Sequence, residues 1–391
     1  MNVVILHEPV PADAPPDAAD VLVQAEAIAK ALTVAGHRTT TLAFAPAEPH
    51  WIDRLTGLRP DVVFNLVETI DGSCRGAEAA PALLERLGIP YTGCGPTAMR
   101  EATDKLRSKQ ILLANDLPTP LHLSWEALQQ DRAVPAARYI VKSVWEHGSV
   151  GLETDCVLAA DCTAMLRDAL AARLPRFGGT GFAETYVPGR EFNLALLETA
   201  DGKDVECLPP AEIAFANAES DGPRLVGYRA KWASGSAEDL DTPRCFDFAE
   251  RDAALLRRVT ELARAVWRAF GLRGYARVDL RVDEHGEPFV IDVNTNPCLS
   301  PDAGFAAAVA RARIGYPQLV DRLLAAARSH RAPRDVLRTE LRDGDEQLVR
   351  EIVDSTGFFH AEEVDIAVEL VAERRAKGDA SGYHFVFLER G

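Results

Sequence analysis

The segment Ala276 to Pro297, ARVDLRVDEHGEPFVIDVNTNP, carries the residue types and spacing best suited to chemistry. It reads as two strands with period-two alternation, joined by a turn that contains glycine. Arg277 and Asp279 share one face of the first strand, and Asp292 and Asn294 share one face of the second. If the two strands pair as a hairpin, these four polar side chains lie on a single face.

We expect Val282 to pair with Phe289, which sets Asp279 opposite Asp292. The apolar face of the second strand then consists of Phe289, Ile291 and Val293. Like charges that lie directly opposite one another are unfavourable on a sheet, so the two carboxylates predict a cation between them. Oxygen ligands of this kind suit Mg²⁺ or Mn²⁺. A solvated polar face, common on one side of an antiparallel sheet, is the alternative.

Bulk properties narrow the class of protein. The 391 residues suffice for two or three domains, and the composition is that of an ordinary globular protein. A formal charge of −16 argues against nucleic acid or an anionic membrane as the main partner. The seven cysteines are scattered without a C-x-x-C motif, which is typical of a reduced cytoplasmic protein. We expect no signal peptide and no membrane span.

Residues 1–100 alternate strand and helix patterns, which predicts a small parallel α/β domain. Ligands of such domains usually lie beyond the carboxyl ends of the strands. Glu68 follows the buried run Asp61 to Val67, so it is a candidate for contact with a substrate.

Two further segments favour a nucleotide site. The strand Tyr139 to Lys142 leads into the glycine loop His147-Gly-Ser-Val-Gly151, whose backbone N–H groups could cradle phosphates. Further along, Glu184-Thr-Tyr-Val-Pro-Gly-Arg-Glu191 bridges two strands. It is either a charged strand edge or a hinge that holds a base and a ribose. Lys231 falls in a polar segment that we interpret as a mobile loop. No P-loop motif occurs.

These motifs occur in one order, together with VFNLVE at 63–68, GIPYT at 88–92, DKLRSK at 104–109 and NTNP at 294–297. That order resembles the ATP-grasp superfamily, and most closely its D-alanine–D-alanine ligase branch, over residues 1–327. The resemblance implies an α/β, α+β fold: an N-terminal domain over 1–100 and an ATP-grasp domain over 101–330. Two subdomains, at about 101–185 and 186–330, would clasp ATP between them.

The resemblance also implies roles for individual residues. Nucleotide contacts would come from Lys105 and Lys142 on phosphates, Ser149 and Val150 in the lid loop, Glu184 near the adenine amine, Val187 at the hinge, Glu191 on the ribose and Lys231 at the γ-phosphate. Magnesium ions would be held by Asp279, Asp292 and Asn294, and the catalytic set would be Arg277, Lys231 and Ser149. Substrate contacts would come from Glu68, Arg277, Cys298 and Ser300, with Asp20 a weaker candidate.

The implied reaction is an ATP-dependent ligation of amino acids or a small peptide through an acyl phosphate. This chain departs from the branch on the amino-acid side of the site. Gly148 aligns with the first of the two loop serines of the branch, and Trp232 replaces the tyrosine that follows the phosphate lysine. The segment Cys298 to Ala303 lacks the glycine and the serine that the branch has there. We therefore expect substrates other than two D-alanines. Asp292 also replaces the usual glutamate. Alternatives are another ATP-grasp reaction on a small acid, or a regulatory ATP-binding module without turnover. The branch further implies a homodimer.

Residues 331–391 read as a strand, two helices and a strand, with TGFF and SGYHFVF. This short αβ tail resembles the opening of a GNAT acetyltransferase. The pyrophosphate loop of that family has no counterpart before Gly391, so we expect no binding of acetyl-CoA. The tail would be a fragment of a longer fusion or a docking remnant.

Overall fold

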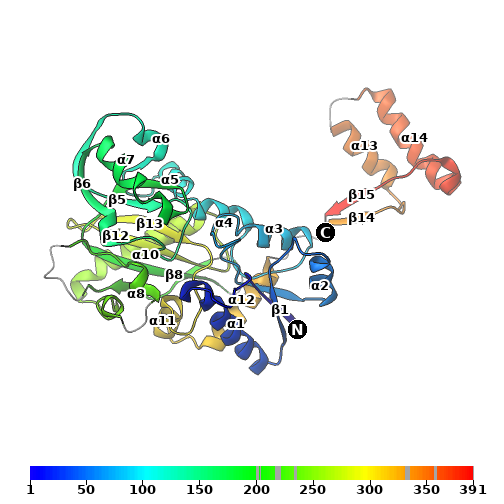
Figure 1. Ribbon diagram of the computed structural model, residues 1–391. Coiled ribbons are helices and arrows are strands. Elements are labelled where there is room, and N and C mark those ends of the chain that lie inside the picture. The colour runs from blue at the N-terminus through cyan, green and yellow to red at the C-terminus, as the bar shows by residue number, and fades with distance from the viewer. Residues whose placement is uncertain are drawn as a thin grey trace. The chain divides into compact units, whose positions relative to one another are not determined.

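The computed structural model contains two compact units, Met1–Arg331 and Ala332–Gly391 (Figure 1). It describes residues 1–199, 202, 204–215, 222–232, 236–330, 335–355 and 359–390. Within these described residues, the larger unit holds three sheets and the smaller unit holds one. Among the described residues, no helix is long and apolar enough to cross a membrane.

The first sheet of the larger unit is parallel, as the alternation of strand and helix patterns predicted. Its strands are β1 (Asn2–His7), β2 (Arg38–Ala43) and β3 (Val62–Asn65), in the order β2-β1-β3. Both pairings are parallel, with Ile5 of β1 opposite Phe64 of β3. The chain leaves β3 towards Glu68, which therefore follows the carboxyl end of that strand.

The second sheet is antiparallel and contributes one wall of the site. Its strands are β4 (His122–Ser124), β5 (Ala133–Ser143), β6 (Val157–Cys162) and β7 (Gly181–Thr185), in the order β4-β7-β5-β6. Its apolar face packs on the helix α7 through fully buried side chains such as Leu166 and Leu170. The opposite face is free to line a cavity.

The third sheet is also antiparallel and contributes the other wall. Its main strands are β8 (Arg190–Glu198), β10 (Ala211–Ile213), β11 (Arg244–Cys245), β12 (Tyr275–Val282) and β13 (Pro288–Asn294), in the order β11-β10-β8-β12-β13, and β9 (Val205–Cys207) pairs with β8. In Figure 1, β5 and β6 lie above β12 and β8.

Helices cover the sheets of the larger unit. They are α1 (Pro16–Val34), α2 (Trp51–Gly57), α3 (Ala79–Arg86), α4 (Pro96–Thr103), α5 (Lys105–Ala114), α6 (Trp125–Leu128), α7 (Thr163–Ala171), α8 (Tyr228–Trp232), α9 (Ala237–Leu240), α10 (Ala253–Ala269), α11 (Gly304–Arg311) and α12 (Tyr316–Ser329). The amphipathic helix α10 buries Val259, Ala263 and Val266 against the third sheet.

One hydrophobic core joins the N-terminal domain to the end of the larger unit. Ile28 and Leu32 of α1 belong to the same buried cluster as Leu197 of β8 and Leu323 of α12. The helix α12 contacts both β3 and β8, so this core joins the parallel sheet to the third sheet and fixes Glu68 relative to the hairpin. The domain boundaries at about 100 and 185 stay a prediction.

The smaller unit contains α13 (Asp345–Ser355), α14 (Ala361–Lys377) and a two-stranded antiparallel sheet of β14 (Asp335–Arg338) and β15 (Phe387–Arg390). Arg338 forms two hydrogen bonds of 2.8 Å with the carboxylate of Asp345, and both residues are buried. The order strand, helix, helix, strand agrees with the pattern in the sequence. The resemblance to an acetyltransferase stays a prediction.

Candidate active site

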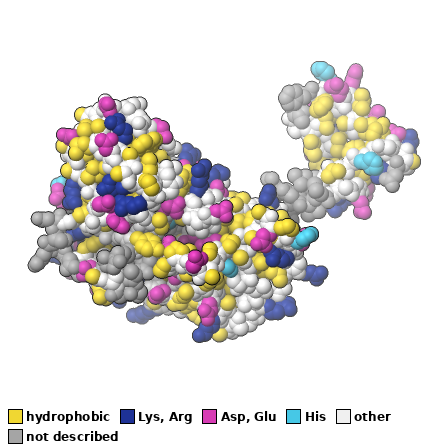
Figure 2. Space-filling view, viewed as in Figure 1, with side chains coloured by type: hydrophobic (Ala, Val, Ile, Leu, Met, Phe, Trp, Pro, Cys, Tyr) yellow, Lys and Arg dark blue, Asp and Glu magenta, His cyan; other side chains and the backbone are white. Residues whose placement is uncertain are grey.

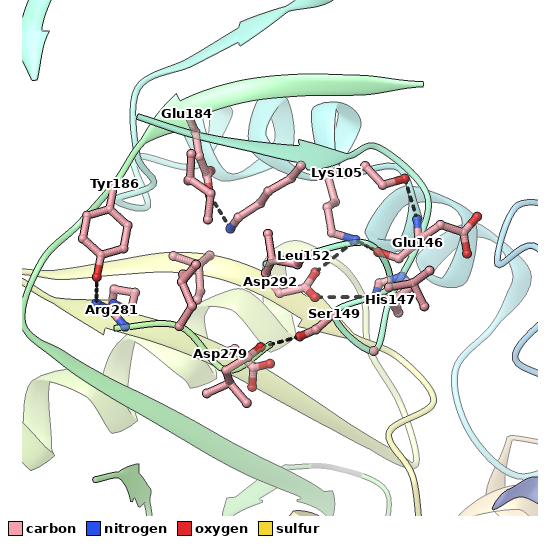
Figure 3. A pocket seen from close by; sticks show the side chains of 18 of the residues that line it. Lys105, Glu146, His147, Ser149, Leu152, Glu184, Tyr186, Asp279, Arg281 and Asp292 are labelled. Carbon is pink, nitrogen blue, oxygen red and sulfur yellow. Dashed lines mark hydrogen bonds and ion pairs between the residues drawn. The ribbon is translucent and has the colours of Figure 1, made fainter. Parts of the chain in front are cut away.

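A cavity with about 870 Å³ of empty space, partly open to solvent, lies between the second and third sheets (Figure 3). One wall comes from β5 and β7, and the opposite wall from β12 and β13. The nucleotide residues and two of the metal residues expected from the sequence line it: Lys105, Lys142, Ser149, Val150, Glu184, Val187, Glu191, Lys231, Asp279 and Asp292. Segments nearly 190 residues apart in the chain therefore meet at one cavity, as the motif order predicted.

Glu184 lies at a buried position in this cavity, with 1% of its side chain exposed. The ammonium of Lys109 lies 2.5 Å from Oε2, and the ammonium of Lys142 lies 2.5 Å from Oε1. Burial alone would raise the pKa of the Glu184 carboxyl, but the two lysines hold that pKa below its ordinary value. Glu184 is therefore an ionised acceptor, and Lys142 is paired with it in this structure.

Lys109 was not among the predicted site residues, although a signal for it exists in the sequence. It follows Lys105 by four residues on α5, and residues at this spacing share one face of a helix. Asp104 caps this helix by accepting the N–H groups of Leu106 and Arg107, both at 3.0 Å. The cap fixes the first turn, and with it the position of Lys105.

The hairpin of β12 and β13 sets Asp279 opposite Asp292 and Arg277 opposite Asn294, as predicted. All four side chains reach the same side of the sheet, and Arg277 binds both oxygens of Asp279 at 2.7 and 2.8 Å. Asn294 donates to Asp279 at 3.2 Å. Three members of the polar patch expected from the alternation, Arg277, Asp279 and Asn294, therefore form one connected network.

The expected pairing of Val282 with Phe289 is wrong, because the register shifts between Asp279 and Leu280 and Val282 pairs with Pro288. Ile291 is the extra residue, a β-bulge in β13. The bulge also corrects the predicted apolar face, since Val290 and Val293 lie in the core whereas Ile291 lines the cavity. The bulge thus gives the cavity an apolar contact beside the two carboxylates.

Asp292 faces a lysine and a histidine from two other segments. Lys105 of α5 lies 3.9 Å from its Oδ1, and Nδ1 of His147 lies 3.5 Å from its Oδ2. Burial opposes ionisation, but Lys105 and His147 hold the pKa of Asp292 well below its ordinary value. In Figure 3 dashed lines join Asp292 to Lys105 and to His147.

The donor set fits a hard divalent cation. Asp279, Asp292 and Asn294 offer carboxylate and amide oxygens on adjacent strands, and Mg²⁺ is usually held by one or two carboxylates plus substrate phosphates. Among the described residues, no three His, Cys, Asp or Glu side chains already converge as a closed metal cluster. Such a cation would therefore take part of its coordination from a bound nucleotide.

The glycine loop at 146–151 closes one end of the cavity. Ser149 has a φ of 64°, and its hydroxyl donates to the carbonyl of Val226 at 2.7 Å. Gly151 has a φ of 70°, and a Cβ there would lie 2.7 Å from the carbonyl oxygen of Arg176. Lys105 donates to the carbonyl of Glu146 at 2.9 Å. The loop is thus held by contacts on both of its flanks.

Lys231 lies on α8, which corrects its expected place in a mobile loop. The expected loop also included Trp232, which ends α8, and ran to about Asp241, but Ala237–Leu240 form α9. Residues 233–235 of this predicted loop lie outside the described residues. Tyr228, on the same helix, donates to Asp17 near the start of α1 at 2.7 Å. This contact and that of Ser149 with Val226 hold the segment 222–232 over the cavity.

A second cavity of about 340 Å³ adjoins the first, because His147 lines both. Glu68 and Asn294 line it, so the predicted substrate and metal residues meet there. Burial and the neighbouring carboxylate of Glu8 raise the pKa of Glu68 to about 8. The hairpin of β12 and β13 therefore lines part of this cavity, and the cavity carries an acid whose pKa lies near neutral pH.

The remaining predicted substrate residues surround Asp20. Its carboxylate accepts from the hydroxyl of Ser300 at 2.9 Å and from the thiol of Cys298 at 3.0 Å. Burial and the nearby carboxylates of Glu68 and Asp20 raise the pKa of the Cys298 thiol, which is therefore not a nucleophile at neutral pH. Asp20 joins this group although we expected it only as a weaker candidate.

Sequence reasoning missed Arg281, which lies in the first cavity. Its guanidinium donates to Glu191 at 2.9 Å and to the carbonyl of Val187 at 3.0 Å. The alternation of the strand contained the signal, since Arg281 follows Arg277 and Asp279 at the same spacing and on the same face.

Two antiparallel sheets that clasp a cavity lined by lysines and carboxylates, under a glycine loop, define the ATP-grasp class of enzymes. Residues 124–325 match the family model described as D-ala D-ala ligase C-terminus, which is more than half of the chain. The chain belongs to the D-alanine–D-alanine ligase family, whose members are ATP-dependent ligases that form carbon–nitrogen bonds.

Individual proteins support this assignment. The chain is 32% identical over 304 residues to a D-alanine–D-alanine ligase of Gluconobacter oxydans, covering 77% of this chain and 91% of that protein. It is 31% identical over 311 residues to the uncharacterised protein y4sG of Sinorhizobium fredii, covering 77% and 86%. The fold matches a D-alanine–D-alanine ligase from Bacillus anthracis complexed with ATP, with a TM-score of 0.60 and 18% identity over 85% of this chain and 98% of that one.

Proposed function

We propose that this chain is an ATP- and Mg²⁺-dependent carboxylate–amine ligase that joins amino acids or a small peptide through an acyl phosphate, releasing ADP and phosphate. One observation carries the proposal: the two cavities meet at the hairpin that bears Asp292 and Asn294. A nucleotide in the first cavity would present its terminal phosphate to a carboxylate in the second.

The first cavity suits ATP from end to end. Glu184 is an ionised acceptor for the adenine amine, and Glu191 is a carboxylate at the place expected for the ribose. Lys105, Lys231 and the backbone of the glycine loop supply donors for phosphates. Binding of the terminal phosphate beside Asp279 and Asp292 would complete the coordination of Mg²⁺, which would neutralise phosphate charge.

In the first step, a carboxylate oxygen of the substrate attacks the γ-phosphorus and ADP leaves. Two anions meet in this step, so positive charge must surround them. Lys105 and Lys231 supply that charge, and both line the cavity. Arg277 lies beside Asp279 and would stabilise the oxyanion that forms when an amine attacks the acyl phosphate.

In the second step, the amine nitrogen forms a bond to the acyl carbon, the carbon–oxygen bond to phosphate breaks, and the amine loses a proton. Water would compete with the amine for the acyl phosphate. The glycine loop and the segment 222–232 are joined by the hydrogen bond from Ser149 to Val226, so together they can exclude water.

We propose that the substrate pair is not D-alanine with D-alanine. Gly148 offers no hydroxyl where the family has its first loop serine, and Cys298 follows Pro297 where the family has glycine. Cys298 and Ser300 both donate hydrogen bonds to Asp20, so the residues that follow the hairpin contact a carboxylate of α1. Gly148 lines the first cavity beside His147, which lines both cavities, and Cys298 follows the segment Asn294 to Asn296 that lines the second.

We further propose a cytoplasmic location and a homodimer. All seven cysteines are free, which agrees with a reducing compartment. Figure 2 shows Lys, Arg, Asp and Glu side chains interspersed over the visible described surface of the larger unit, which suits small-molecule substrates better than nucleic acid.

The test is phosphate release from ATP and Mg²⁺ with a panel of D- and L-amino acids, alone and in pairs. We expect a specific pair other than two D-alanines to stimulate release, and mass spectrometry to show the dipeptide. Stimulation by two D-alanines alone would contradict the substrate proposal. Binding of ATP with no stimulation by any pair would contradict the ligase proposal and favour a regulatory ATP-binding module.

A further inference from the structure

Arg281 is among the most engaged side chains of the nucleotide cavity. Only 5% of it is exposed, although it lines the cavity. One guanidinium nitrogen, Nη1, donates to Oε2 of Glu191 at 2.9 Å and to the carbonyl of Arg224 at 3.1 Å. Nε donates to the carbonyl of Val187 at 3.0 Å, and Nη2 to the hydroxyl of Tyr186 at 3.1 Å.

These partners come from three segments around the base and ribose end of the cavity. Tyr186 and Val187 form the hinge between the two sheets, and Glu191 begins β8. Arg224 belongs to the segment that covers the cavity, and its N–H donates to the Tyr186 hydroxyl at 2.9 Å. One guanidinium therefore connects the hinge, the strand β8 and the segment that covers the cavity. This is possible because the guanidinium is planar and carries five N–H donors.

The pairing with Arg281 also sets the charge of the cavity. The Glu191 side chain is 12% exposed, and an unpaired carboxylate at such a position would repel a triphosphate and be costly to bury. Arg281 balances that charge through Oε2 and leaves Oε1 to accept a ribose hydroxyl. The carboxylate is thus held in place before the nucleotide arrives.

We propose that Arg281 is the specificity-determining residue of the nucleotide cavity: by fixing Glu191 and the hinge carbonyl of Val187, it makes the cavity selective for ribonucleotides. This inference rests on the proposed function, because it assumes that Glu191 receives the ribose. It assigns Arg281 a positioning role and no contact with the reacting atoms.

Arg190 provides a matched control on the adjacent strand, opposite Val282. It is also held by carboxylates, with Glu212 at 2.7 Å and Asp252 at 2.7 Å, and its guanidinium lies 5.0 Å from the ring centroid of Phe192. It does not line the nucleotide cavity formed by the described residues. The Arg190 side chain is 32% exposed and that of Arg281 is 5% exposed, so purely structural roles would make the two variants differ in stability and not in nucleotide preference.

The experiment measures equilibrium binding of ATP, 2′-deoxy-ATP and 3′-deoxy-ATP to the full chain with Mg²⁺ and without amino acids. A hydrogen bond to a charged group predicts that the wild type prefers ATP over one or both deoxy analogues by about tenfold or more. In Arg281→Met the affinity for ATP should fall by about tenfold or more, and the preference should drop towards one.

Arg190→Met should lower the unfolding midpoint but keep the wild-type preference. Arg281→Lys keeps the charge on a flexible stem, so it should fold and restore part of the ATP affinity but little of the preference. It also tests the inference if Arg281→Met does not fold. An undiminished preference in a folded Arg281 variant, or an equal loss in Arg190→Met, would overturn the inference.

The same measurement separates this inference from the proposed function. If the wild type binds no ATP, the proposed function fails before Arg281 is tested. If the wild type binds ATP and ligates a pair of substrates, but the Arg281 variants keep the wild-type preference, the inference alone fails.

Discussion

Glu184 is the position at which we expect a substitution to lower the free energy of unfolding most. The substitution Glu184→Gln removes a carboxylate that lies 2.5 Å from the ammonium groups of both Lys109 and Lys142. The two lysines are 3% and 15% exposed, so water cannot replace the lost charge. The variant therefore leaves two like charges close together in a buried site.

Breaking a buried ion pair by removal of one partner costs about 3–5 kcal/mol. Because Glu184 has two partners, we expect Glu184→Gln to lower the free energy of unfolding by at least the lower end of that range. Lys109→Met should cost about 1–2 kcal/mol, since Glu184 keeps Lys142. The double variant Glu184→Gln with Lys109→Met lacks one of the two lysine charges. Its loss in the free energy of unfolding should therefore be smaller than the sum of the two single losses by more than about 1 kcal/mol.

Urea unfolding followed by tryptophan fluorescence measures these changes. All five tryptophans lie before residue 332, so the signal reports on the larger unit. Glu126→Gln is a suitable control, because Glu126 is an exposed carboxylate of the same sheet region. Costs that add without coupling, or a Glu184→Gln variant as stable as the control, would refute the reasoning on this network.

Three further variants test other parts of the site. Asp279→Asn should retain the fold by circular dichroism yet lose nearly all turnover, and substantial residual turnover would show that the metal site is misplaced. Burial raises the pKa of Glu8 from 4.5 to about 7, so the folded state keeps this carboxyl protonated to a higher pH than the unfolded state does. The free energy of unfolding should therefore fall by up to about 3 kcal/mol as pH rises from about 5 to about 8. Glu8→Gln should flatten that profile in a pH series of urea unfolding, and an unchanged slope would contradict the shift. Gly189→Ala places a Cβ in a clash with the carbonyl oxygen of Val282 and should cost about 2 kcal/mol or more, whereas Gly286→Ala, which meets no atom within 4 Å, should cost less.

The polar side of the site could be predicted well from the sequence. Alternation placed Asp279 opposite Asp292, because side-chain direction in a strand repeats every two residues. The order of motifs brought Lys142, Glu184 and Lys231 to one cavity, as the structure shows. These predictions rest on local spacing and on family order, both of which are contained in the chain itself.

The remaining features depend on contacts that local patterns do not encode. The bulge at Ile291 changes the register without a glycine or proline to mark it. Arg281 and Glu191 are separated by 90 residues, so their pairing follows only from the pairing of β8 with β12. Lys231 lies in a segment rich in glycine and serine, and contacts such as that of Tyr228 with Asp17 support the short helix that carries it.

The most direct test of the central claim follows one oxygen atom. The acid substrate of the active pair is labelled with ¹⁸O in its carboxylate and incubated with the enzyme, ATP and Mg²⁺, and the released phosphate is analysed by mass spectrometry. Formation of an acyl phosphate predicts one ¹⁸O atom in each phosphate released. Product formation with unlabelled phosphate would contradict attack of the carboxylate on ATP, and with it the proposed mechanism.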